Sequence, residues 1–271
     1  MMARVVFQKS ELLMAKKIER RSFNMAKIPK KVVYNGFLYS WEDPTSSHNA
    51  KYRGKSLGAF TDSYASAVAS YQFADMYVGD TFTQNGHTYK IGGFNYLLGA
   101  DHNDDLPPHL LMITDVLTTH QMNSSDTTSG GFAGSEMWKS YFPTVVKQLK
   151  ADFGSHLLTW NEYLTTGTNG NAANQGNFFP VQASMMNTVM CWGSSSQYST
   201  PVNGKNYNIG IETKQLPIMQ LHPDSRAIPN TWWWLRDVYN SSGFAVVYGD
   251  GGARWTYAGN TGGVRAFFLI N

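Results

Sequence analysis

The chain has 271 residues, of which 42% are apolar and 14% aromatic, so it can bury a sizeable core and is not predicted to be disordered. Only 15% of the residues are charged, and the many Gly, Ser, Thr and Asn residues favour strands, turns and long loops. No stretch approaches the roughly 20 apolar residues that a membrane-spanning helix requires. The single cysteine, Cys191, excludes an internal disulfide framework and a cysteine-based zinc site.

The first 31 residues form a basic arm. They carry nine basic and two acidic side chains, whereas the whole chain has a net charge of only +3, so the remaining residues are mildly acidic. Because few aromatic residues are interleaved with the charges for base stacking, the arm predicts docking on an acidic protein surface and no nucleic-acid partner. The alternative is a solvated leader, shortened if translation starts at Met14 or Met25. Because the same charges interrupt the apolar positions, no apolar core of a signal peptide is visible in this arm.

Residues 32–58 are predicted to form an attachment region that precedes the body. Residues 32–41 read as two short strands that turn at Asn35-Gly36, a dipeptide that adopts the positive φ values of tight hairpins. Residues 42–58 are polar and rich in turn formers, which predicts a hinge before a domain at 59–271.

Within the body, residues 60–77 have apolar spacing that predicts an amphipathic helix capped near Thr61 or Asp62. Residues 76–91 alternate in polarity and predict two strands around an Asn85-Gly86 turn. Residues 110–117 predict a short apolar strand.

Residues 137–153 again show helical spacing, with Pro143 bending or restarting the helix and Gly154 ending it. Further strands are predicted near the C-terminus. Helices and strands mixed in this order, separated by long loops, indicate an α+β fold. Loops of such length are typical of functional segments.

Several short motifs occur in order along the chain. They are Val-Gly-Asp-Thr-Phe (78–82), Gly-Gly-Phe-Ala-Gly-Ser-Glu-Met (130–137), Phe-Gly-Ser-His-Leu-Leu-Thr (153–159) with Glu-Tyr-Leu (162–164), Gln-Leu-Pro (215–217), Trp-Trp-Leu-Arg-Asp (233–237) and Gly-Val-Arg (263–265). This ordered set resembles a family of bacteriophage and prophage structural proteins with a C-type-lectin-like domain. The resemblance covers roughly residues 50–271, and its last part is the most specific.

The resemblance implies a C-type-lectin-like domain with long loops, preceded by a short N-terminal attachment region. It implies that residues 238–260 are displayed between adjacent scaffold strands, to which Trp234, Arg236, Gly263 and Arg265 belong. In related phage adhesins the corresponding region binds the host receptor. The residues that we expect to contact a ligand are Tyr239, Asn240, Tyr248, Arg254, Trp255 and Tyr257, because aromatic and amide side chains suit sugar recognition.

The sequence also predicts the surroundings of the arginines and tryptophans in the scaffold strands. Arg236 and Arg265 lie in apolar strands, so each is expected to meet a carboxylate or several carbonyl groups, with Asp237 as one candidate partner. The alternative is that either arginine grips an anionic ligand. Because alternate side chains of a strand face opposite sides, one of the three consecutive tryptophans must face away from the others. We predict that this residue is Trp233 and that it faces solvent or an interface.

No enzyme, cofactor or metal is expected. Formylglycine-generating enzymes share the lectin-like fold, but this chain lacks their cysteine pair. Residues 101–105 (Asp-His-Asn-Asp-Asp) offer donors for a divalent ion, yet their spacing is irregular for a Ca²⁺ loop and favours a solvated loop. The Pro-containing triplets at 222–224 and 228–230 lack the first ligand of calcium-dependent sugar lectins. A glycosidase-type pair of carboxylates stays open, because such pairs form only in space.

The predicted function is that of a phage virion structural protein, a fibre, collar or head-decoration subunit, made in the host cytoplasm. Its N-terminal region would bind other virion proteins, while the lectin-like domain adheres to a host cell-surface polysaccharide or receptor. A homo-oligomer is expected, because single sugar contacts are weak without multivalency. The main alternative is a purely structural decoration or connector protein whose exposed aromatic residues pack on neighbouring virion subunits. A third hypothesis is a host-encoded or prophage-derived enzyme that acts on host cell-wall polymers.

Overall fold

The computed structural model describes residues 31–34, 37–40, 44–73, 75–195 and 198–271. The chain divides into two compact units, Met1–Glu42 and Asp43–Asn271. In the first unit, β1 (Lys31–Tyr34) and β2 (Phe37–Ser40) pair antiparallel, as predicted. The Asn35-Gly36 turn and residues 1–30 of the predicted basic arm lie outside the described residues.

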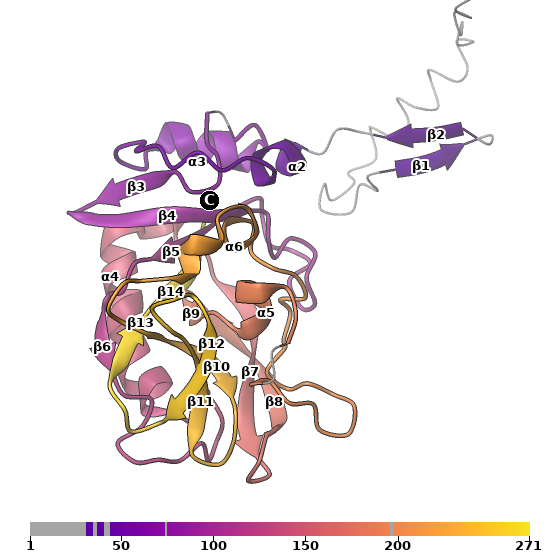
Figure 1. Cartoon of the computed structure of the whole chain (residues 1–271). Coiled ribbons are helices and arrows are strands. Elements are labelled where there is room, and N and C mark those ends of the chain that lie inside the picture. The colour runs from indigo at the N-terminus through magenta and orange to yellow at the C-terminus, as the bar shows by residue number, and fades with distance from the viewer. Residues whose placement is uncertain (1–30, 35–36, 41–43, 74, 196–197) are drawn as a thin grey trace, which may run out of the picture. The chain divides into compact units, whose positions relative to one another are not determined.

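The described residues of the second unit form three sheets (Figure 1). The first has the order β3 (Thr81–Gln84), β4 (His87–Phe94), β5 (Leu110–Thr114), β14 (Ala266–Ile270), β9 (Ser184–Met185). The second has the order β12 (Ala253–Tyr257), β11 (Gly243–Val247), β10 (Trp233–Val238), β13 (Gly262–Val264), β6 (Thr118–His120). The third pairs β7 (Trp160–Thr168) with β8 (Ala173–Val181). All of these strand pairs are antiparallel except β10–β13.

Short helical segments connect the sheets. They are α2 (Pro44–Asn49), α3 (Asp62–Ala69), the π-helix η2 (Met137–Tyr141), α4 (Phe142–Phe153), η3 (Gly154–His156), α5 (Thr188–Trp192), α6 (Pro217–Leu221) and η4 (Pro223–Arg226). The mixture confirms the predicted α+β class. Among the described residues, none of the helices combines the length and the apolar character that crossing a bilayer demands.

Turn chemistry explains where several elements end. Asn85 and Gly86 both have positive φ and connect β3 to β4, as predicted. The helix expected over residues 60–77 is shorter than predicted: α3 ends at Ala69 because the chain turns through positive φ at Tyr71 and Phe73. Thr61 is its N-cap residue, although its side chain makes no capping hydrogen bond.

The helix expected over residues 137–153 is present and restarts at Pro143, as predicted. Proline has no N–H to donate to the carbonyl of residue 139, and the turn before it is the π-helix η2. Gly154 ends α4 with a φ of 55°, a value that glycine adopts without steric cost.

Residues 44–58 belong to the body, which differs from the hinge predicted within residues 42–58. The Asn49 amide exchanges two hydrogen bonds with the backbone of Phe94, at 2.9 and 2.8 Å. Arg53 pairs with the buried carboxylate of Asp80, 2.6 Å from Nη2. The division between the two units therefore falls after Glu42, before the predicted boundary at residue 59. Long-range contacts of this kind leave no local pattern in the sequence.

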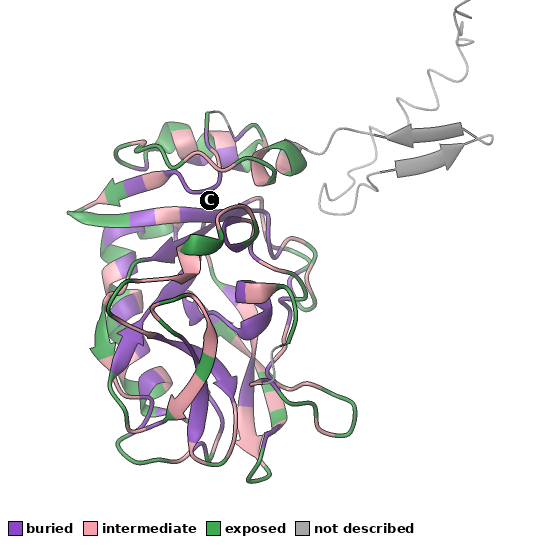
Figure 2. Ribbon diagram, viewed as in Figure 1, coloured by how far each residue is buried: buried purple, intermediate pink, exposed green. Residues whose placement is uncertain are grey.

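The core lies along the central strands. Every residue of β5, β10, β11 and β14 is buried, so Figure 2 colours these strands purple. A strand buried on both faces shows a continuous apolar run instead of alternation. By contrast, β12 at the edge of its sheet mixes exposed and half-buried residues. The sheet thus extends from buried central strands to the accessible edge strand β12.

Candidate functional site

The two scaffold strands predicted from the sequence lie side by side. β10 pairs with β13 in parallel, with Trp233 opposite Gly263. A side chain on the neighbouring Gly262 would overlap the ring of Trp232, so glycine allows this close approach. Trp234, Arg236 and Gly263 therefore belong to adjacent strands, as the resemblance implied. Arg265 lies at the junction between β13 and β14.

Arg236 is buried and binds two glutamates. Its Nη2 lies 2.5 Å from Glu212 Oε2 and 3.2 Å from Glu162 Oε1. The carboxylate partner was predicted, but the candidate Asp237 is wrong. Asp237 accepts hydrogen bonds from the backbone and hydroxyl of Thr188, at 2.9 and 2.7 Å, because successive strand residues face opposite sides.

The two glutamates share one cation in a fully buried place. Trp160 Nε1 donates to Glu162 Oε2 at 3.1 Å, and Asn187 Nδ2 donates to Glu212 Oε2 at 3.2 Å. Among the described residues, Oε1 of each glutamate accepts no hydrogen bond. Burial raises the pKa of Glu162 well above its usual value, and the neighbouring Glu212 adds to the rise. We infer that Glu162 holds a proton, because Arg236 balances the charge of only one of the two buried carboxylates.

This carboxyl pair is the spatial pair that the sequence left open. A small pocket of about 180 Å³, lined by Tyr96, Glu212 and Lys214 among others, lies beside it. The side chains of Glu162 and Glu212 are themselves completely buried, so neither carboxyl group is open to solvent. We therefore assign the cluster to the scaffold.

The raised pKa of Glu162 predicts a pH-dependent stability. The folded state keeps a proton that the unfolded chain releases above pH 4.5, so this stabilising contribution is complete below pH 4.5 and is lost as the pH rises toward the folded pKa. We expect the free energy of unfolding to fall by up to about 1.4 kcal/mol per pH unit from this one proton. The Glu162→Gln variant, which keeps the oxygen for Trp160, should lack that slope. Urea titrations at about pH 5, 6 and 7 measure it.

Asp237 and His109 also make the stability depend on pH, with opposite signs over nearly the same pH range. Burial raises the pKa of Asp237 from 3.8 to about 6, which adds to the fall in stability as the pH rises. Burial lowers the pKa of His109 from 6.5 to about 4, so stability from His109 is lost as the pH falls through that range. Both groups are present in the wild type and in Glu162→Gln. Identical pH slopes for these two proteins would contradict a protonated Glu162.

Arg265 is held by carbonyl groups, as predicted. Its Nε donates to Thr114 O at 3.1 Å and its Nη1 donates to Ser225 O at 2.9 Å. The guanidinium lies 4.8 Å from the centre of the Trp233 ring. Both scaffold arginines are thus buried and hydrogen-bonded inside the protein, which argues against the alternative that either grips an external anion.

The prediction that Trp233 faces solvent or an interface is wrong. Trp233 is completely buried, and its Nε1 donates to Arg226 O at 2.9 Å. Because β10 is covered on both faces, alternation along the strand brings none of its side chains to the surface. Trp232, just before the strand, is the half-buried member of the three and packs edge-on against Trp234, with ring centres 4.9 Å apart.

An aromatic row lines one face of the edge strand β12. The ring of Trp255 lies 4.9 Å from Tyr239 and 5.3 Å from Tyr257, and Tyr198 lies 5.3 Å from Tyr239. We call these four residues the aromatic row. Trp255 and Tyr257 share a face because they are two positions apart on the strand. Tyr257 is 48% exposed, whereas the other three are half-buried.

Gly243 allows the ring of Trp255, at the centre of the row, to pack closely against the neighbouring strand. A Cβ atom at this position would lie 2.7 Å from the six-membered ring of Trp255. The ring therefore rests against the backbone of β11, on which Gly243 is opposite Tyr257. An aromatic side chain that is packed on one side and open on the other offers a rigid surface to a ligand.

The six predicted contact residues do not form one site. Tyr239, Trp255 and Tyr257 meet in the aromatic row. Tyr248 and Arg254 lie 5.9 Å apart, ring centre to guanidinium carbon, in a second cluster at the β11–β12 turn. All six predicted residues are at least partly exposed.

Asn240, by contrast, shapes a turn. Its Oδ1 accepts a hydrogen bond from the backbone N–H of Ser242 at 2.9 Å. Sequence reasoning missed Tyr198, the fourth member of the row, because it is distant along the chain and belongs to no shared motif.

The acidic segment at residues 101–105 is anchored through its central residue. The Asn103 amide donates to the carbonyl of Asn161 on β7 at 2.9 Å, and the ring of His102 lies 3.9 Å from that of Phe178. Asp101 remains mostly exposed. Within the described ranges, no group of three or more His, Cys, Asp or Glu side chains is placed to hold a metal ion.

Comparisons with protein-family models, with characterised proteins and with solved structures found no match to this chain.

Proposed function

We propose that this protein is a phage virion structural subunit whose body adheres to a host-surface glycan or receptor through the aromatic row on β12. The ordered motifs that resemble phage proteins with lectin-like domains support the virion assignment. The observation that carries the adhesive role is the row itself, which joins residues from distant parts of the chain on an accessible sheet edge.

The row has the physical properties of a sugar-binding surface. Aromatic rings present flat apolar faces to the C–H groups of a pyranose, and tyrosine hydroxyls reach its oxygens. Trp255 packs against Tyr239 and against the backbone of Gly243, so little side-chain entropy is lost on binding. In this proposal residues 1–42 attach the subunit to other virion proteins, and a homo-oligomer multiplies weak contacts into firm adhesion.

Replacing Trp255 and Tyr257 together by alanine should leave the fold intact and reduce adsorption to host cells by about tenfold or more, the effect of losing at least one buried aromatic contact. Binding of the purified protein, or of virions that carry the variant, to host cells measures the effect. Tyr248→Ala is the matched control, because Tyr248 is 45% exposed but lies outside the row. Adsorption that is unchanged in the double variant, or lowered equally by Tyr248→Ala, would contradict this surface.

The structural alternative is supported by the open edge of β12. Among the described residues, no strand pairs with the side of β12 that faces away from β11. Such an edge offers free backbone groups to a neighbouring chain. If the protein is a decoration or connector subunit, a reconstruction of the particle will show the aromatic row covered by a neighbour. A row exposed to solvent in that reconstruction favours adhesion.

A further inference from the structure

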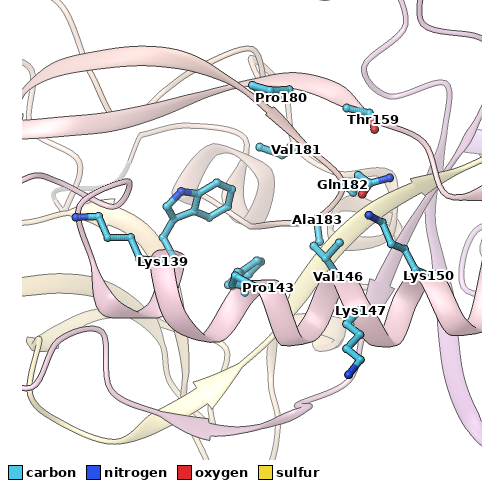
Figure 3. A pocket seen from close by; sticks show the side chains of 12 residues that line it. Lys139, Pro143, Val146, Lys147, Lys150, Thr159, Pro180, Val181, Gln182 and Ala183 are labelled. Atoms are coloured by element: carbon cyan, nitrogen blue, oxygen red, sulfur yellow. The ribbon is translucent and has the colours of Figure 1, made fainter.

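A groove separate from the aromatic row lies between the η2–α4 helical segment and the chain that leaves β8. It has a volume of about 720 Å³ (Figure 3). The helical wall uses positions three or four apart between Trp138 and Lys150, which form a single helix face. The opposite wall consists of residues 180–183 with Thr159. No residue of the aromatic row lines this groove.

The groove concentrates positive charge on an otherwise mildly acidic body. Lys139, Lys147 and Lys150 line it, and all three are exposed. Within the described part of the chain, none of them forms a salt bridge. Figure 3 shows Lys150 rising toward the segment that carries Gln182, whereas Lys147 points the opposite way. A ligand whose charge complements this surface is therefore an anion.

The floor of the groove is apolar and rigid. The half-buried ring of Trp138 packs against Phe132 and Phe142, with ring centres 5.6 and 5.8 Å away. The polar side chains of Gln182 and Thr159 also line the groove. An aromatic face, an amide, a hydroxyl and flanking cations together suit a sugar ring that carries an acidic group.

We propose that this groove binds an acidic polysaccharide, a polymer of pyranose rings that carry carboxylates. One ring stacks on Trp138, and Lys139 and Lys150 pair with carboxylates on either side of it. These two lysines are roughly 16 Å apart along the helix at a rise of 1.5 Å per residue, so their partners belong to different sugar units. Monodentate pairing is the usual contact of a lysine ammonium.

Other occupants fit less well. The basic arm at residues 1–31 would be repelled by the lysines. A peptide that adds a strand along β8 meets Pro180, which has no N–H to donate. A polymer of glycerol phosphate supplies charge but has no ring to stack on Trp138.

The test uses the full chain and polygalacturonate as the probe. We expect measurable binding that weakens with added salt, and a Kd at least tenfold higher for the Lys139→Glu/Lys150→Glu double variant. The matched control is Lys51→Glu/Lys205→Glu, which changes the net charge equally at two exposed lysines outside the groove. This control should bind as the wild type does. Thermal unfolding confirms that each variant is folded.

Comparison polymers make the proposal falsifiable. Absence of binding to polygalacturonate, equal binding to neutral dextran, or an equal loss in the control variant would overturn it. Equal binding to poly-glutamate or to poly(glycerol phosphate) would show that charge alone acts, which also overturns the glycan assignment. The Trp255→Ala/Tyr257→Ala variant should bind polygalacturonate normally, so failure of the aromatic row and failure of this groove are separately visible.

Discussion

Replacing Arg236 by methionine is expected to lower the free energy of unfolding by about 3–5 kcal/mol, the usual cost of removing one partner from a buried ion pair. The substitution leaves Glu162 and Glu212 fully buried without their shared cation. Methionine fills much of the space, so the loss reports charge more than volume. Urea unfolding at neutral pH measures it.

The matched test removes the acidic groups that Arg236 contacts. In a triple variant with Arg236→Met, Glu162→Gln and Glu212→Gln, much of the lost stability should return, because no buried charge is left unpaired. If Arg236→Met alone costs less than about 1 kcal/mol, well under the range expected for a buried pair, the cluster does not hold the scaffold as we describe.

Trp233→Ala is expected to cost about 3–5 kcal/mol, as large-to-small substitutions of buried aromatic residues do. The ring is completely buried, its Nε1 satisfies Arg226 O, and its face covers the guanidinium of Arg265. A cavity at this place would therefore leave a carbonyl unpaired as well as weaken packing. Differential scanning calorimetry should show a much lower Tm.

Trp255→Ala is the comparison for this prediction, since both tryptophans lie in the same sheet. Trp255 sits half-buried on the edge strand, so its loss should change stability by only about 1 kcal/mol. The Trp233→Phe variant separates the hydrogen bond from the packing. Should Trp233→Ala and Trp255→Ala prove equally mild, the core position of Trp233 would be refuted.

Much of the local structure was predictable. The alternation around Asn85-Gly86 predicted the β3–β4 hairpin, and the spacing that begins at Met137 predicted the helix with its restart at Pro143 and its end at Gly154. In each case the deciding interactions lie within a few residues of one another. The predicted length of α3 was too great. The chain turns through positive φ values at Tyr71 and Phe73, and neither position is a glycine that would have indicated the turn.

The candidate site was only partly predictable. The sequence correctly placed Tyr239, Trp255 and Tyr257 on the outside of the body, but it grouped them with Tyr248, which the strand places in another cluster. The sequence did not predict a groove beside Trp138, because its two walls come from a helix and from the end of a distant strand.

By itself the sequence determined the α+β class, several turns and helix ends, and the need of Arg236 and Arg265 for buried partners, because backbone preference, periodicity and the cost of an unpaired charge act on short segments or single side chains. Only the tertiary structure decided that Glu162 and Glu212 are the partners of Arg236, that Trp233 is buried, and that Tyr198 joins the aromatic row. These outcomes depend on which strands become neighbours and which faces they cover. That order arises from packing the whole chain at once, so no local segment contains it.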